Sequence, residues 1–155
     1  MPHVQATATV EGAPEEIFDF LTKYENVTRL QPQFQSARVV SPQPSGLGAV
    51  VELKGHFHGI PMTVHNRIIT FSPPYRMVSI SEGTVLSRNT WELRPVDGAE
   101  HPATQVSFIV EYKLSGPLGG LFTGLTSSIF HKEVQSLTDA SLHRLKDIFS
   151  RRERG

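Results

Sequence analysis

The sequence predicts an α+β fold in which a curved antiparallel sheet of seven strands wraps around a long C-terminal helix. Residues 3–115 read as short strands with one early helical interruption, whereas residues 118–152 have helical spacing and no further Pro. Gly116-Pro117 separates the two patterns. Short turns join the strand-like runs, and a parallel pair would need a long crossover, so consecutive strands are antiparallel neighbours. No linker, repeat or low-complexity tract interrupts the chain, so we expect one domain over residues 1–155.

The first elements are a strand and two short helices. Residues 3–11 alternate in polarity and place small apolar side chains on one face, namely Val4, Ala6, Ala8 and Val10. Pro14 suits the first position of a helix, and Glu15 and Glu16 follow at the positive end of its dipole. A second short helix that ends near Pro32 is indicated by Val27, Leu30 and Phe34.

Six further strands follow, each bounded by turn-forming residues such as Gly and Pro. Their predicted ranges are 37–40, 48–58, 62–71, 76–82, 85–94 and 104–114. The terminal helix carries two apolar stripes that lie about 100° apart on a helical wheel. Either a bend between Gly124 and Ser128 or gradual wrapping around a twisted sheet would turn both stripes inward. The second stripe consists of Phe130, Val134, Leu137, Ser141, Leu145 and Ile148.

The composition excludes several classes of function. Fifteen basic residues balance fifteen acidic ones, which gives no electrostatic reason to expect nucleic acid or an anionic membrane as a partner. The absence of Cys excludes disulfides, thiolate nucleophiles and Cys-ligated zinc. No apolar run approaches the roughly 20 residues that span a bilayer, and residues 1–3 lack the features of a secretion signal. We therefore expect a cytoplasmic protein without integral membrane association, and no pattern indicates its oligomeric state.

Three stretches resemble the sequences of a known protein family: residues 6–18 (ATATVEGAPEEIF), 67–78 (RIITFSPPYRMV) and 110–119 (VEYKLSGPLG). Together with the order of elements, they resemble the START/Bet v 1-like (SRPBCC) superfamily, in particular its polyketide cyclase/dehydrase and lipid transport branch. The resemblance implies a helix-grip fold with an elongated cavity between sheet and helix. Residues 100–103 (EHPA) depart from the usual tight turn. The cavity is physically plausible, because a helix about 10 Å wide cannot cover seven strands spaced about 4.8 Å apart.

Alternation predicts which side chains face this cavity, because the face of each strand without charged residues turns inward. Over residues 76–82 the assignment stays open between Met77, Ser79 and Ser81 on one face and Val78, Ile80 and Glu82 on the other. Over residues 62–71 the inward set excludes Ile69 and Phe71. The predicted ligand-binding residues are Phe57, Met62, Asn66, Asn89, Trp91, Phe108, Val110 and Tyr112, closed by Phe122, Leu125 and Ile129.

The polar members of this set have two interpretations. Asn66, Asn89 and the Tyr112 hydroxyl could orient a polar group of a ligand, or the amides could bond to backbone, buried water or each other. His56, His58 and His65 could share one face of a hairpin and bind a metal there. Alternation places these imidazoles on the outer face, so a solvated polar surface is favoured and neither a metal nor a cofactor is predicted.

We therefore expect binding or transport of a hydrophobic or amphipathic small molecule, such as a lipid, isoprenoid or polyketide. The resemblance implies an alternative, a polyketide cyclase or dehydratase that acts on a cavity-bound substrate. General acid–base chemistry needs an inward titratable group, yet none of the seven histidines is assigned inward, and Glu82 is inward only under the alternative assignment. No catalytic residue is therefore predicted. A protein-interaction module is a second alternative, although no charge run or exposed apolar stripe favours it.

Overall fold

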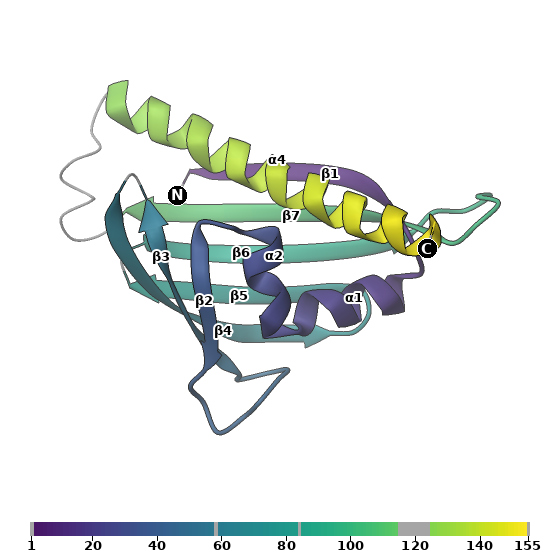
Figure 1. The fold of residues 1–155 in the computed structure, drawn as a ribbon, viewed down its shortest axis with the longest axis horizontal. Coiled ribbons are helices and arrows are strands. Elements are labelled where there is room, and N and C mark those ends of the chain that lie inside the picture. The colour runs from purple at the N-terminus through teal and green to yellow at the C-terminus, as the bar shows by residue number, and fades with distance from the viewer. Residues whose placement is uncertain (1, 58, 84, 115–124, 155) are drawn as a thin grey trace.

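The computed structural model describes residues 2–57, 59–83, 85–114 and 125–154. Seven antiparallel strands form one sheet in the order β1-β7-β6-β5-β4-β3-β2, which confirms the predicted topology (Figure 1). Each strand pairs with its neighbour in sequence except β1, which pairs with β7. The strands are β1 (His3–Glu11), β2 (Phe34–Val39), β3 (Val50–Phe57), β4 (Ile60–Ser72), β5 (Arg76–Gly83), β6 (Val85–Pro95) and β7 (Ala103–Leu114).

The described helices lie over one face of the sheet, with the long C-terminal helix α4 (Leu125–Arg154) running across it (Figure 1). Helix α1 (Pro14–Thr22) begins at the predicted Pro, and its first turn contains Glu15 and Glu16. A short 3₁₀ turn, η1 (Tyr24–Asn26), and helix α2 (Val27–Leu30) follow. This segment carries the chain from β1 at one edge of the sheet to β2 at the other.

The hydrophobic core lies between the sheet and the helices. Val4, Ala6 and Val10 on β1 are buried, as their alternation predicts. The second apolar stripe of the terminal helix also faces the core, because Phe130, Ser141 and Leu145 are buried, and Val134 and Ile148 pack against the core cluster. The predicted bend between Gly124 and Ser128 involves residues outside the described ranges and stays a prediction.

Two sequence predictions are wrong in detail. Phe34 does not belong to the second helix but begins β2, because the chain leaves helical geometry at Gln31, with φ −127° and ψ 79°. Phe71 does not face outward with Ile69. The pairing of β4 with β5 shifts between Ile68 and Thr70, and this bulge reverses the alternation. Ile69 is therefore exposed, while the Phe71 ring lies 5.5 Å from that of Phe18.

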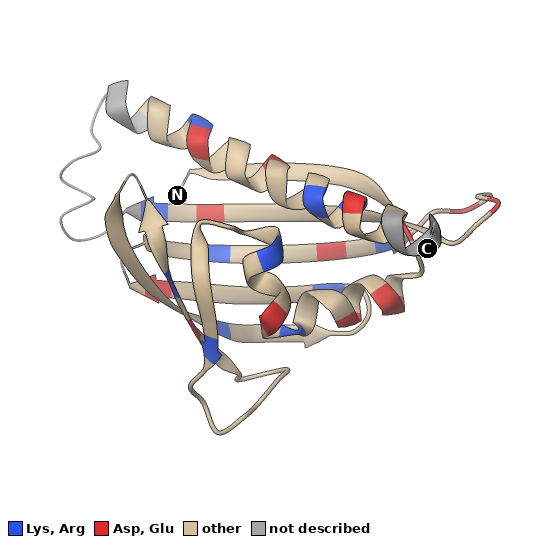
Figure 2. Ribbon diagram, viewed as in Figure 1, with Lys and Arg blue, Asp and Glu red and all other residues tan. Residues whose placement is uncertain are grey.

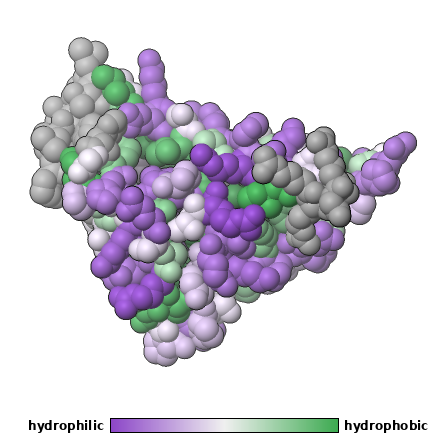
Figure 3. All heavy atoms as spheres, viewed as in Figure 1, coloured by the Kyte–Doolittle hydropathy of each residue, from purple (hydrophilic) through white to green (hydrophobic). Residues whose placement is uncertain are grey.

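The outer surface mixes charges of both signs. Figure 2 shows Lys and Arg interspersed with Asp and Glu on strands and helices. Figure 3 shows a face that is mainly hydrophilic, with apolar side chains in separate patches. Among the described residues, none of the helices has the length and apolar character needed to cross a membrane.

Candidate functional site

A pocket of about 190 Å³ lies between the sheet and helix α4. It brings together eight of the residues predicted to face a cavity, namely Phe57, Met62, Asn66, Asn89, Trp91, Phe108, Val110 and Tyr112. Phe122 lies outside the described residues, and the side chain of Leu125 is not described. Ile129 does not close the pocket as expected, because its side chain is 59% exposed on α4.

Aromatic side chains form much of the pocket wall. Trp91 on β6 stacks on Phe108 of the neighbouring strand β7, with ring centroids 3.9 Å apart and planes at 6°. Phe130 of α4 meets Phe57 and Tyr112 edge-on, each at 5.3 Å between centroids. Ring contacts thus join the helix to β3 and β7, yet the space between them stays open. Trp91 therefore forms part of the wall and does not plug the interior.

Strand β5 resolves the assignment that the sequence left open. Met77, Ser79 and Ser81 line the pocket, whereas the Glu82 side chain is 65% exposed and lies 4.0 Å from Arg67 on the outside. Glu82 therefore does not supply a carboxylate to the interior, and this strand gives no support to an enzymatic role.

The floor of the pocket carries a polar network across three strands. Ser81 donates a hydrogen bond of 2.8 Å to the side-chain oxygen of Asn66. The Asn89 side-chain nitrogen donates to Ser81 at 3.2 Å and to Ser79 at 3.5 Å, and its oxygen accepts from Ser87 at 3.2 Å. The two asparagines are thus linked through Ser81, and serine side chains are partners that the sequence analysis did not name.

Tyr112 and His131 form a titratable pair that sequence reasoning missed. The Tyr112 hydroxyl lies 2.6 Å from Nδ1 of His131 on helix α4. Tyr112 is buried at the pocket wall, and this burial raises its pKa above the ordinary value of 10.0. His131 is half-buried beside Phe130, one position off the apolar stripe. His131 lies on α4, where strand alternation makes no prediction, and its imidazole is connected to the pocket through the Tyr112 hydroxyl.

Two glutamines at the pocket wall were also missed. Gln31 and Gln33 follow α2 and line the pocket from the loop that leads into β2. This loop lies against β3, where the His56 amide donates to the Gln33 carbonyl oxygen at 3.2 Å. Gly55 permits the approach, because a Cβ there would lie 2.8 Å from the Gln33 carbonyl carbon. Loop residues have no periodicity, so only the polar residue type could have drawn attention to them.

Of the three histidines considered for a metal, the two that the structure describes lie apart. His65 lies opposite Glu52 on β3, whereas His56 lies opposite Pro61 at the end of the hairpin, and His58 lies outside the described residues. No group of three metal-binding side chains occurs in the part of the chain that the structure describes. The outer face at His65 is a network of charges.

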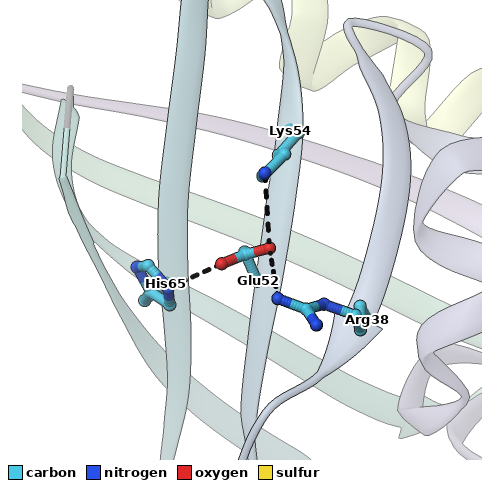
Figure 4. A network of polar contacts seen from close by, with 4 residues as sticks. All are labelled: Arg38, Glu52, Lys54 and His65. Carbon is cyan, nitrogen blue, oxygen red and sulfur yellow. Dashed lines mark hydrogen bonds and ion pairs between the residues drawn. The ribbon is translucent and has the colours of Figure 1, made fainter.

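Glu52 is the centre of that network (Figure 4). Its carboxylate accepts a hydrogen bond from Arg38 at 3.0 Å, and it lies 3.2 Å from His65 and 3.8 Å from Lys54. The hydrogen bond from Arg38 is the main cause that lowers the pKa of Glu52, and the nearby charges add to it. This cluster stabilises the outer face of β2, β3 and β4 and lies away from the pocket.

Solved structures with the same fold cover nearly the whole chain. TTHA0849 from Thermus thermophilus has a TM-score of 0.74 at 20% identity over 94% of this chain and 95% of its own. Zhui aromatase/cyclase from Streptomyces sp. R1128 has a TM-score of 0.73 at 18% identity over 97% and 94%. Ara h 8.0201 has a TM-score of 0.60 at 17% identity over 93% and 97%. At these identities the likeness shows the fold, and it confirms the helix-grip α+β architecture.

The sequence itself also has a family match. No curated protein matches this chain. Residues 1–149 match the family described as polyketide cyclase/dehydrase and lipid transport. This match spans β1 to α4, and the fold, the order of elements and the pocket between sheet and helix agree with it. The chain therefore belongs to the polyketide cyclase/dehydrase and lipid transport family.

Proposed function

We propose that this protein binds and carries a hydrophobic or amphipathic small molecule in the pocket between the sheet and α4. The open pocket carries this proposal, because its wall is mainly apolar and aromatic, with polar groups on the floor, in one loop and at Thr138 and Ser141 of α4. Such a composition is typical of small-molecule sites. The family match supports it, since the family description includes lipid transport.

Burial of apolar ligand surface would supply most of the affinity. About 200 Å² of ligand surface removed from water contributes about 5 kcal/mol before the costs of ordering. The flat Trp91–Phe108 stack offers a surface for a ring or a chain. Trp91 is also the only tryptophan of the chain, so its fluorescence reports directly on occupancy of the pocket.

The test combines native mass spectrometry of the purified protein with fluorescence titrations. We expect a co-purified apolar molecule, or saturable quenching of Trp91 by biphenyl. Val110→Phe should fill the pocket and abolish the quenching, because Val110 lines it. Ile69→Phe is the matched control, since Ile69 lies on the exposed bulge of β4. Equal quenching in both variants, or none in the unaltered protein together with no bound molecule, would reject the proposal.

The Tyr112–His131 pair favours a second candidate, an aromatase or cyclase activity. The Tyr112 phenol lines the pocket and contacts the His131 imidazole behind it, and such a pair can pass a proton, as general acid–base catalysis requires. In an aldol closure, the pair would take the proton from the attacking carbon and return one to the new oxygen, and water would leave in a later step. Zhui aromatase/cyclase, a structural neighbour, is named for chemistry of this kind.

This candidate is tested with a β-polyketone thioester and ultraviolet detection of aromatic product. Turnover should fall in Tyr112→Phe and in His131→Gln, while Trp91 quenching by biphenyl stays unchanged. Absence of turnover by the unaltered protein at saturating substrate would exclude the cyclase and leave the carrier proposal intact.

A further inference from the structure

Two polar groups of the pocket lack a partner within the described part of the chain. The first is the side-chain oxygen of Gln33, which is buried without a hydrogen-bond donor. The second is the side-chain nitrogen of Asn66, since the hydrogen bond of this side chain is made by its oxygen. Both residues line the pocket. A buried polar group without a partner destabilises a protein, so the Gln33 oxygen points to a ligand that completes it. Asn66 is only partly buried, and its side-chain nitrogen offers donors to the same ligand.

The nitrogen of Asn66 ends a chain of hydrogen bonds that all run in one direction. Ser87 donates to the oxygen of Asn89, and the nitrogen of Asn89 donates to Ser81. Ser81 in turn donates to the oxygen of Asn66. Each side chain in this series donates to the one that follows it, so the N–H groups of Asn66, the last in the series, are unused. The end of the chain at Asn66 therefore offers N–H groups and suits an acceptor such as a carbonyl oxygen.

Gln33 offers a hydrogen-bond acceptor, whereas Asn66 offers donors, and the backbone of Gln33 is fixed in position. Its backbone oxygen accepts from the His56 amide at 3.2 Å, which ties the loop to β3. The same contact is made possible by Gly55, where a Cβ would collide with this segment. The backbone is thus held in place, while the side-chain oxygen of this pocket-lining residue is buried and remains an unused acceptor. It suits a donor such as a hydroxyl group.

The two groups lie apart along the sheet. The Gln33 loop contacts Gly55, which pairs with Met62 of β4, and Asn66 lies four residues further along the same strand. Four residues of a strand span about 13 Å. Side chains that lean into the pocket shorten this separation to roughly 10 Å between the polar atoms of a ligand.

We propose that the pocket selects an elongated apolar molecule with a carbonyl oxygen at one end and a hydroxyl group at the other. Asn66 donates to the carbonyl oxygen, and Gln33 accepts from the hydroxyl. This inference rests on the proposed carrier function and adds the kind, polarity and spacing of the ligand's polar groups. Asn66 and Gln33 are then the residues that determine specificity.

Four related probes test it: biphenyl, its para-hydroxy derivative, its para-acetyl derivative, and the compound that carries both groups at opposite ends. Dissociation constants are measured by quenching of Trp91. Each polar group should tighten binding about fivefold, the effect of one neutral hydrogen bond. The compound with both groups should therefore bind about 25-fold more tightly than biphenyl.

Single substitutions assign each gain to its residue. In Gln33→Met the advantage of the hydroxyl should disappear and that of the acetyl group remain, and Asn66→Leu should show the reverse. Gln31→Met is the matched control, because Gln31 lines the pocket from the same loop without a buried unpaired oxygen. It should keep both advantages.

Stability of the empty protein supplies an independent readout. Gln33→Met should raise the melting temperature by about 3 °C, because the substitution removes a buried oxygen that has lost its contact with water and gained no hydrogen bond in return. Gln31→Met should show no such rise.

The outcomes separate the two proposals. If none of the four probes binds and no molecule co-purifies with the protein, the carrier function fails and the selection fails with it. If all four probes bind equally to the unaltered protein, the selection is wrong and the carrier function stands, and this result does not depend on any variant folding. Loss of both advantages in Gln31→Met as well would also overturn the assignment to Gln33.

Discussion

Gly55→Ala is the sharpest test of how the pocket wall is built. In an ordinary strand, Ala is more favourable than Gly by about 0.5–1 kcal/mol, because Gly loses more backbone freedom on folding. Gly55 does not have the left-handed backbone that would make Ala strained. Without a close contact, the substitution would therefore stabilise the protein.

The close approach of the Gln33 loop makes Gly55→Ala destabilising instead of stabilising. A Cβ on residue 55 would lie 2.8 Å from the Gln33 carbonyl carbon and 2.9 Å from Cα of Phe34, where ordinary contact begins at 3.4 Å. The loop must therefore move by more than half an ångström. The hydrogen bond from His56 to Gln33 is lost, at about 1 kcal/mol. Disturbed packing at the start of β2 raises the expected cost to about 2–3 kcal/mol.

Urea unfolding of the variant and the unaltered protein measures this cost. We expect the free energy of unfolding to fall by about 2–3 kcal/mol, which corresponds to a melting temperature lower by about 4–12 °C for a chain of this size. Lys54→Ala, an exposed neighbour on β3, controls for changes to the strand itself. A Gly55→Ala protein as stable as the original, or more stable, would refute the proposed contact between the loop and β3.

Three further predictions concern the charges, the pocket tyrosine and the bulge. Glu52 has a lowered pKa in the folded protein, so its contribution is complete above its ordinary value of 4.5 and is lost as the pH falls through the folded value. Glu52→Gln should therefore flatten the acid side of a plot of urea midpoint against pH, whereas an unchanged acid side would contradict the role of Arg38. Tyr112 has a pKa raised by burial, so its contribution is present below 10.0 and is lost as the pH rises above that value. Tyr112→Phe should remove this alkaline decline and, through loss of the bond to His131, cost about 1 kcal/mol at neutral pH. Ile69→Ser should change stability by less than about 0.5 kcal/mol, and Phe71→Ala should cost about 2 kcal/mol. A larger loss of thermal stability in Ile69→Ser than in Phe71→Ala would show that the bulge is misplaced.

The strands could be predicted because their signals are local. Alternation and turn residues indicate each strand directly, and the exclusion of charged residues from one face indicates which side is buried. Strand β1, for example, has the predicted bounds His3–Glu11. The rule fails where an extra residue enters a strand. At Ile69 the bulge reverses the alternation, and nothing in the local pattern of β4 reveals it.

The site was predictable only where it lies on regular strands. Eight of the expected residues line the pocket, and all eight lie on β3, β4, β6 or β7. Gln33 was missed because loops have no period from which to infer a direction. His131 was missed because its role depends on the position of α4 over Tyr112, a contact between residues 19 positions apart. Tertiary contacts of this kind are not encoded in any single window of sequence.

Strand β2 has a consequence for how copies of the protein behave toward one another. It forms one end of the sheet, has six residues, and contains a register shift at Gln35, which lies between Phe34 and Ser36. A regular row of unused amides would recruit a strand from a second molecule, whereas a short and interrupted row is a poor template. Deleting Gln35 would restore a continuous ladder, and the protein should then become prone to fibre formation.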